Sequence, residues 1–261
     1  MERSVFRSIM VQARVIWALV LREMTTRYGR ENIGFLWIIG EPILFCGGVA
    51  IAWTAMRPAH EHGLPVTAIV ITGYVPLTMW RHCIGRAVKA YESNGSLLFH
   101  RQVTPLDIIT ARVILEVAGT IMAAVVVTTT AILVGFMDPP KDIGLVFVGL
   151  AYQALFCYAS ALLIASLSEM SDVVEKMVSV ISYLAIPFSG AFTMVDWVPK
   201  NFQFILLWSP SVNNVEMIRG GQFGSAAHPI YDLYYDTWMT ALLLLIGISL
   251  TLRVRRFLVI Q

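Results

Sequence analysis

The sequence predicts an all-α polytopic membrane protein with six transmembrane helices, an N-terminal interfacial amphipathic helix and a re-entrant helical hairpin on the outer side. Hydrophobic residues fill 57% of its 261 positions and charged residues only 14%, whereas a soluble domain carries about 25% charge. Several apolar runs approach or exceed the ~20 residues that a helix needs to cross the hydrocarbon core, and uninterrupted runs of this length exclude a β-barrel. The composition therefore excludes a disordered chain, a nucleic-acid-binding module and a typical cytosolic enzyme.

Residues 1–33 are expected to form a cytoplasmic helix that lies on the membrane surface. At about 100° per residue, one side of the helix is apolar and includes Trp17. The opposite side carries Arg3, Arg7, Arg14 and Arg22. An arginine-rich face opposite a tryptophan-containing apolar face is typical of a helix in the membrane plane. The alternative, a helix packed on a soluble core, finds no such core in this chain.

Six apolar stretches are the candidate transmembrane helices. They cover about 34–56, 64–83, 110–137, 143–168, 174–195 and 235–253. The last is short, and the tyrosines and tryptophan beside it complete the span as an interfacial aromatic belt. In this topology fifteen lysines and arginines lie on one side and four on the other, so the positive-inside bias places both termini in the cytoplasm.

The cytoplasmic loop 84–107 is long for a connection between two spans. Its sequence indicates a helix over 87–91 and a second helical piece over 96–99, separated by a turn. Two interpretations remain open. The loop is a solvated linker, or it is a docking element for a cytoplasmic partner with Tyr91 and Leu98 as apolar anchors.

The outer segment 196–234 contains a stretch, 202–208, that is too short to cross the bilayer and too apolar to lie in water. A Ser-Pro pair ends this stretch, and a Gly-Gly pair ends the short helix that follows. The pattern predicts a helical hairpin that dips into the outer leaflet. A gate over a pore and a simple interfacial cap are equally compatible with it.

Glu41 is the one carboxylate well inside a predicted span, and it stands beside Pro42. An intramembrane acid is a functional-site hypothesis by default; the alternative, favoured here, is a structural Glu that satisfies backbone groups freed by Pro42. Spacing of four residues predicts two local ion pairs, Arg112 with Glu116 and Asp172 with Lys176. The three widely spaced cysteines are expected to be small buried hydrophobes.

Several motifs of enzyme chemistry are missing from the sequence. It contains no G-x-x-x-x-G-K-[ST] loop and no H-E-x-x-H. The triplet His60-Glu61-His62 lies in a short outer loop and is expected to be solvated rather than to hold a metal. We therefore expect no catalytic residue, no metal and no cofactor in this chain, which is not an enzyme by itself.

Three segments resemble ABC-2 type permeases, in the branch that exports capsule polysaccharide. The 21–42 segment, LREMTTRYGRENIGFLWIIGEP, is similar to the family's R-E-x-x-x-R-Y…G-x-L-W…P pattern. The 97–116 segment looks like the cytoplasmic loop that leads into the third helix, and 194–223 is similar to the outer hairpin, with its [NS]-P and E-x-x-R elements. Ser209 stands where many relatives have Asn. The resemblance implies a single ABC-2 type transmembrane domain over 1–261.

The resemblance also implies what the domain does. Such a permease is a homodimer in the bacterial inner membrane, and it works with two copies of a separate P-loop ATPase that bind ATP and Mg²⁺. The expected substrate is a lipid-linked capsular polysaccharide, and the expected further partners are a periplasmic adaptor and an outer-membrane channel. The alternatives are a permease for O-antigen, teichoic acid or a drug, and a non-transporting membrane scaffold.

Three groups of candidate site residues follow. The ATPase-coupling candidates, which the resemblance places at the cytoplasmic face, are Arg86, Tyr91, Glu92, Leu98, Arg27 and Tyr28. The candidates for a periplasmic gate in the hairpin are Trp197, Pro199, Phe204, Trp208, Pro210, Glu216 and Arg219. A sugar chain presents flat C–H faces that aromatic rings can guide. The substrate-path candidates are Trp17, Trp37, Glu41, Tyr74, Tyr152, Tyr183 and Phe188.

Overall fold

The computed structural model describes residues 2–28, 40, 43–44, 47–49, 51–52, 55–56, 60–98 and 102–258. The predicted first span, 34–56, therefore lies largely outside the described residues. The candidates Trp37 and Glu41 also lie outside them, as do the side chains of Arg27 and Tyr28.

The described part is predominantly helical. Its α-helices are α1 (Glu2–Tyr28), α3 (Val66–Ala87), α4 (Gly95–Leu98), α5 (Pro105–Leu133), α6 (Ile143–Met170), α7 (Asp172–Leu184), α8 (Lys200–Leu207), α9 (Pro210–Phe223) and α10 (Leu233–Leu258). Short 3₁₀ helices are η1 (Glu92–Asn94), η2 (Val195–Trp197) and η3 (Gly224–Ala227). The strands β1 (His60–Glu61) and β2 (Leu64–Pro65) pair antiparallel, with Glu61 opposite Leu64.

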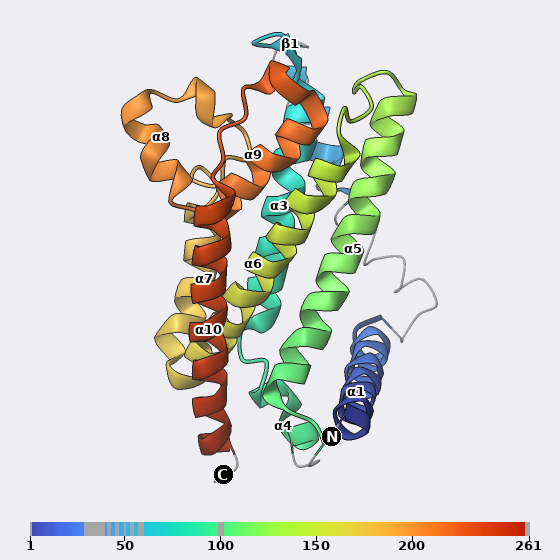
Figure 1. Ribbon diagram of the computed structural model, residues 1–261, viewed down its shortest axis with the longest axis vertical. Coiled ribbons are helices and arrows are strands. Elements are labelled where there is room, and N and C mark those ends of the chain that lie inside the picture. The colour runs from blue at the N-terminus through green and yellow to red at the C-terminus, as the bar shows by residue number, and fades with distance from the viewer. Residues whose placement is uncertain are drawn as a thin grey trace.

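The long helices α3, α5, α6 and α10 run along the long axis of the molecule (Figure 1). Both termini and α4 lie at one end, which we call the terminal end, and the β1–β2 hairpin lies at the other, the β1 end (Figure 1). Among the described residues, α5, α6 and the 233–254 part of α10 are long and apolar enough to cross a membrane. Helix α1 lies beside α5 at the terminal end (Figure 1).

Helix α6 is the centre of the bundle, where it packs against α3, α9 and α10. Small residues allow these backbones to approach closely. A Cβ atom on Gly247 of α10 would lie 2.9 Å from the Cβ of Leu162 on α6. A Cβ on Gly149 of α6 would lie 3.1 Å from the carbonyl oxygen of Asn214 on α9. Close packing of this kind is how helices associate in lipid, where no hydrophobic effect drives them together.

Side-chain caps define where two of the long helices begin. Thr104 and Asp107 form a capping box at the start of α5, with the Thr104 amide donating to Asp107 Oδ2 at 2.8 Å. Asp142 caps α6 by accepting from the Leu145 amide at 3.0 Å. These caps satisfy amides that have no partner inside the helix. Helix α5 covers residues 110–133 of the predicted span 110–137, and α6 covers the whole of the predicted span 143–168.

The fifth apolar stretch, predicted as a span over 174–195, is only partly helical. Helix α7 ends at Leu184, and residues 185–190 form turns. Pro187 has no amide hydrogen to continue a helix, and Gly190 adopts a φ of +66° that favours glycine. The predicted helix over 87–91 is likewise absent, because α3 ends at Ala87 and residues 88–91 form a turn.

The outer hairpin consists of two short helices, α8 and α9, separated at Ser209 as its sequence predicts. All residues of α9 are buried, and the helix runs antiparallel to α6, since its Asn214 lies near Gly149 and its Gly221 near Val146. Helix α8 has no buried residue and projects from the bundle at the β1 end (Figure 1). The hairpin thus has one anchored helix and one free helix.

Candidate functional site

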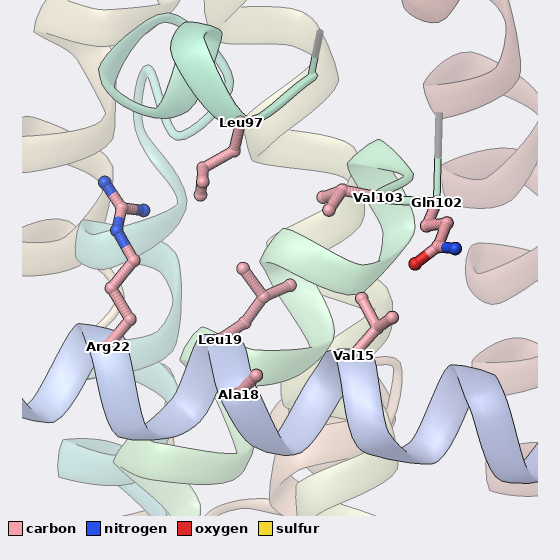
Figure 2. A pocket seen from close by; sticks show the side chains of 7 residues that line it. All are labelled: Val15, Ala18, Leu19, Arg22, Leu97, Gln102 and Val103. Atoms are coloured by element: carbon pink, nitrogen blue, oxygen red, sulfur yellow. The ribbon is translucent and has the colours of Figure 1, made fainter. Parts of the chain in front are cut away.

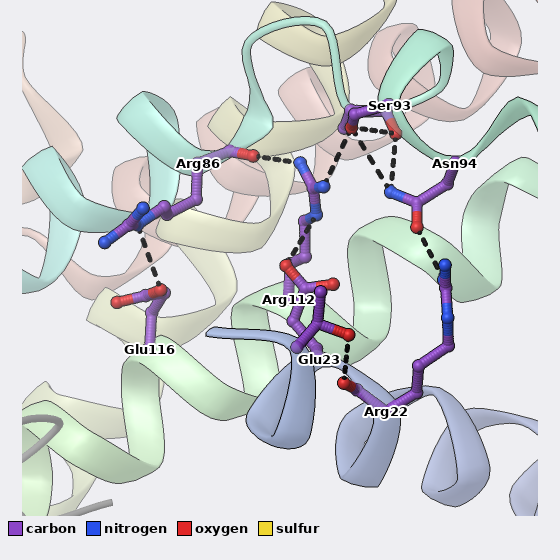
Figure 3. A network of polar contacts seen from close by, with 9 residues as sticks. Arg22, Glu23, Arg86, Ser93, Asn94, Arg112 and Glu116 are labelled. Atoms are coloured by element: carbon purple, nitrogen blue, oxygen red, sulfur yellow. Dashed lines mark hydrogen bonds and ion pairs between the residues drawn. The ribbon is translucent and has the colours of Figure 1, made fainter. Parts of the chain in front are cut away.

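Arg112 of α5 joins three elements at the terminal end (Figure 3). Its Nε lies 3.2 Å from a carboxylate oxygen of Glu23 on α1. One terminal nitrogen donates to the Arg86 carbonyl oxygen at 2.7 Å, and the other donates to Ser93 Oγ at 2.9 Å. Because a guanidinium presents several donors in a fixed plane, this one side chain holds α1, the end of α3 and η1 together.

A second arginine fixes α1 to the segment that links α3 with α5. Arg22 donates to Asn94 Oδ1 at 2.9 Å, and the buried Asn94 side chain donates in turn to the Ala90 carbonyl oxygen at 2.9 Å (Figure 3). Nearer the start of α1, Gln12 donates to the carboxylate of Asp107, which belongs to the capping box of α5. A movement of the 88–98 segment would therefore displace α1.

Glu116 of α5 faces α3 rather than its own helix. Its carboxylate lies 3.6 Å from Arg86 Nε and 3.7 Å from His82 Nδ1. The predicted pair with Arg112 is therefore corrected: Arg112 turns toward Glu23 and η1, while Glu116 turns toward α3. Residues four apart lie on one face of a helix, but here each one meets a partner on a different neighbouring element.

Lys89 attaches the same segment to the beginning of α7. Its ammonium lies 3.2 Å from Glu175 and 3.4 Å from Asp172. Hydrogen bonds to Glu175 and Asp172 raise the pKa of Lys89 above its ordinary value. Asp172 therefore pairs with Lys89, whereas the sequence predicted a pair with Lys176. Glu169 adds to this attachment by accepting the amides of Tyr91 and Glu92.

Tyr91 is buried, so its ring does not lie on the surface, where an apolar anchor for a docking partner would have to be. Its ring lies in an apolar cluster with Cys157 and Ala161 of α6 and Val254 of α10. Its hydroxyl lies 3.3 Å from Thr251 Oγ1, and burial raises its pKa. The turn at 88–90 directs the ring inward, so Tyr91 connects the segment with α6 and α10.

Leu98 also packs inward, half-buried against the same cluster. What the segment leaves exposed is polar: Glu92, Ser93 and Ser96. Arg86, at the end of α3, is exposed as well. The exposed side chains of this segment and of the end of α3 are therefore those of Arg86, Glu92 and the two serines.

A cavity of about 520 Å³ separates α1 from the residues around the start of α5. Its lining residues are Val15, Ala18, Leu19, Arg22, Leu97, Gln102 and Val103. Figure 2 shows Leu19 and Val15 on α1 pointing toward Leu97 and Val103, with Arg22 and Gln102 at its two sides. Four of these residues belong to α1, which therefore forms one wall of the cavity.

At the β1 end, Glu216 and Arg219 of α9 form a buried ion pair with 3.3 Å between Oε1 and a guanidinium nitrogen. Arg219 donates to the carbonyl oxygens of Thr193 and Ala191 at 2.8 and 3.0 Å. Glu216 accepts the amide of Val195 at 3.2 Å. The same carboxylate accepts the Ile230 amide at 3.3 Å.

The gate candidates divide into three groups. Pro210, Glu216 and Arg219 are buried in α9 and hold the hairpin in place. Phe204 on α8 and Trp208, the residue that follows α8, are 66% and 64% exposed, with their rings 5.7 Å apart.

The two other gate candidates lie before α8. Trp197 stacks on His62 of the β1–β2 turn at 4.5 Å, and Pro199 precedes the first residue of α8. Trp197 thus links η2 to the β1–β2 turn.

The ABC-2 type transporter family model matches residues 14–223. The chain belongs to the ABC-2 type transporter family. It is 37% identical over 95% of its length to the capsule polysaccharide export inner-membrane protein BexB of Haemophilus influenzae, of which 94% is covered. It is 36% identical over 97% of its length to CtrC of Neisseria meningitidis, with the same description and 95% covered. It is 27% identical over 96% of its length to the polysialic acid transport protein KpsM of Escherichia coli, with 96% covered.

The described substrate-path candidates of this ABC-2 chain do not line one surface. Tyr74 is buried and packs 6.1 Å from Phe192, so it is corrected from a lining residue to a core residue. Tyr152 is half-buried and its hydroxyl lies 2.9 Å from Thr237 Oγ1. The exposed candidates come from separate elements. They are Trp17, Tyr183 and Phe188.

Sequence reasoning missed a buried polar group in the middle of the ABC-2 bundle. Gln153 of α6 donates to the Pro76 carbonyl oxygen at 3.0 Å and accepts from Asn214 of α9 at 3.0 Å. Asp236 of α10 is also buried, and its carboxylate oxygens have no hydrogen-bond partner among the described residues. Gln153 could have been noticed in the sequence, because it is the one amide side chain in the 143–168 run. Asp236 gives no such signal, because it lies at the boundary of its predicted span, where a carboxylate is not unusual.

Proposed function

We propose that this chain is the transmembrane subunit of an ATP-driven exporter that moves a lipid-linked capsular polysaccharide outward across the inner membrane. The observation that carries the proposal is its 35–37% identity over 95% or more of its length to proteins named for capsule polysaccharide export at the inner membrane. The family and the apolar helices support a membrane location.

Energy for export has to come from a separate subunit, because the sequence contains no P-loop motif. We place the contact with that ATPase, which would bind ATP and Mg²⁺, at the exposed face formed by Arg86, Glu92, Ser93 and Ser96. A push on this face would reach α1 and α5 through Arg112, and α6, α7 and α10 through Lys89 and Tyr91. One docking contact is therefore connected to most of the described bundle.

The working unit is proposed to be a homodimer with six spans per chain, paired with two ATPase subunits, because a two-fold assembly of this chain supplies both halves of a pore.

Both termini lie at one end of the molecule (Figure 1), and we assign that end to the cytoplasm on the positive-inside bias. The α8–α9 hairpin is then periplasmic and acts as the gate. A periplasmic adaptor and an outer-membrane channel would complete the route.

The contact with the ATPase can be tested by co-purification. Ser96→Trp places a large ring on the exposed face and is expected to reduce the co-purified P-loop ATPase at least tenfold. Ser225→Trp is the matched control, since Ser225 is equally exposed but lies in η3 at the β1 end. The measurement is mass spectrometry of the complex isolated from membranes with the tagged full-length chain. Absence of any ATPase from the unaltered chain would refute the proposed function, whereas equal ATPase recovery in both variants would refute only the position of the contact.

A further inference from the structure

Arg81 of α3 differs from the other basic side chains near the end of that helix. Arg86 lies 3.6 Å from Glu116, and Lys89 lies within 3.4 Å of both Asp172 and Glu175. Arg81 has no carboxylate partner among the described residues; its guanidinium lies instead over the ring of Tyr183 on α7, 4.9 Å from the centroid. The chain therefore places an arginine here whose charge no described acid compensates.

Along the long axis, this pair lies well inside the terminal end of the bundle. Arg81 lies six residues before the end of α3, which is about 9 Å along a helix. Tyr183 lies eleven residues after the start of α7, which is about 16 Å from the Lys89–Asp172 pair. Half of the hydrocarbon core is only about 15 Å thick. A charged side chain at such depth is costly and usually marks a pathway.

The guanidinium has an aromatic neighbour on one side and no described acceptor. Its Nε is buried without a hydrogen-bond partner, and among the described residues no acceptor is bonded to either terminal nitrogen, so both remain available to a ligand. The ring of Tyr183, itself 64% exposed, lies under the guanidinium carbon in a cation–π contact. A planar guanidinium beside an aromatic ring still presents its fork of donors for a bidentate bond with a carboxylate or a phosphate.

We propose that Arg81, supported by Tyr183, binds an oxyanion of the transported molecule on the cytoplasmic side of the pore. The oxyanion is either the carboxylate of an acidic sugar or the phosphate of the lipid anchor, and both present the same fork of oxygens. This assignment rests on the proposed function, because it requires a substrate that enters from the terminal end. The exposed ring of Tyr183 offers an apolar face to the adjoining sugar.

The test measures the binding of defined probes to the intact complex of this chain with its ATPase, in nanodiscs of phosphatidylcholine. The probes are fluorescent sialic acid oligomers, fluorescent lyso-phosphatidylglycerol and, as a neutral comparison, fluorescent maltose oligomers. Arg81→Gln is expected to weaken at least one anionic probe tenfold or more. Arg81→Lys, which keeps the charge and loses the fork, is expected to lie in between. Arg253→Gln removes an exposed arginine of α10 at the same end and is expected to change nothing.

Variants of the ring separate stacking from hydrogen bonding. Tyr183→Phe is expected to bind like the unaltered complex, and Tyr183→Leu is expected to bind more weakly. An effect of Arg81→Gln on the sialic acid probe alone assigns the carboxylate, and an effect on the lysolipid alone assigns the phosphate; an effect on both assigns the shared oxyanion. Equal binding by the unaltered complex, Arg81→Gln and Arg253→Gln would overturn the site and leave Arg81 as a contact to membrane headgroups.

The same preparations report separately on the proposed function. If the ATPase is present and Arg81→Gln still binds both probes normally, only the oxyanion site fails. If no ATPase accompanies the unaltered chain, the proposed function itself fails. Thermal unfolding of each variant shows whether it has folded, and Arg81→Lys and Tyr183→Leu keep the site testable should Arg81→Gln be unstable.

Discussion

At the scale of single residues, the buried pair of Glu216 and Arg219 is expected to be a major source of stability for the outer hairpin. Removing one partner of a buried pair leaves the other charge uncompensated, at a cost of about 3–5 kcal/mol. Glu216→Gln and Arg219→Gln are therefore each expected to lower the unfolding temperature strongly. Lys200→Gln, at an exposed position on α8, is the control and is expected to be neutral.

Unfolding of the double variant decides whether the two residues act as a pair. Because the second substitution removes the charge that the first left unpaired, the double variant is expected to lose less stability than the sum of the single losses. The measurement is thermal unfolding of the detergent-solubilised protein followed by circular dichroism. Strictly additive losses would show that the two side chains act independently.

The same residues show what the sequence reveals about a site and what it does not. The E-x-x-R spacing places Glu216 and Arg219 on one face of a helix, and the structure has them 3.3 Å apart. Their other partners, such as the Thr193 carbonyl and the Ile230 amide, come from segments that meet only in the fold. For Tyr91 the sequence neighbourhood is misleading. Charged residues surround it in the chain, but the turn at 88–90 directs its ring into the core.

At the scale of elements, the helices that could be predicted are those marked by local sequence signals, namely apolar runs and capping residues. Helices α5 and α6 form over most of the 110–137 run and all of the 143–168 run, because long apolar stretches follow the capping residues Thr104 and Asp142. The 174–195 run carries no charge from Met177 on, but its helix ends at Leu184, shortly before Pro187, and the positive φ of Gly190 turns the chain further on. The ion-pair partner of Glu116 could not be predicted in this way, because it depends on which neighbouring helix packs against that face of α5.

The contact between α6 and α10 gives a prediction at this scale. A Cβ on Gly247 would lie 2.9 Å from the Cβ of Leu162, closer than van der Waals contact. Gly247→Ala is therefore expected to destabilise the protein by about 1–3 kcal/mol, the usual cost of overpacking. Gly85→Ala is the matched control, because nothing lies within 4 Å of its added methyl group, and alanine favours a helix over glycine.

Thermal unfolding of the two glycine variants gives opposite expected signs. The unfolding temperature is expected to fall for Gly247→Ala and to stay level or rise for Gly85→Ala. A Gly247→Ala variant as stable as Gly85→Ala would mean that α6 and α10 do not approach as closely as the structure has them.

At the scale of the whole molecule, the two ends of the bundle have different construction. At the terminal end, charged side chains join the 88–98 segment to α1, α5 and α7, so a contact there displaces several helices together. At the β1 end, α9 is locked by Glu216 and Arg219, whereas α8 has no buried residue. Motion that reaches the β1 end is therefore expected to move α8 relative to a fixed α9, which is the behaviour required of a gate.

Different outcomes are expected for two similarly exposed phenylalanines at the β1 end. Phe204 lies on α8 and is 66% exposed, and Phe136 follows α5 and is 61% exposed. Phe204→Asp puts a charge on the apolar face of the free helix, where it would disrupt closure against the membrane or the second protomer. It is expected to abolish surface polysaccharide while ATPase co-purification stays normal. Phe136→Asp is expected to preserve both. Normal surface polysaccharide in cells carrying Phe204→Asp at unaltered protein levels would show that α8 does not gate export.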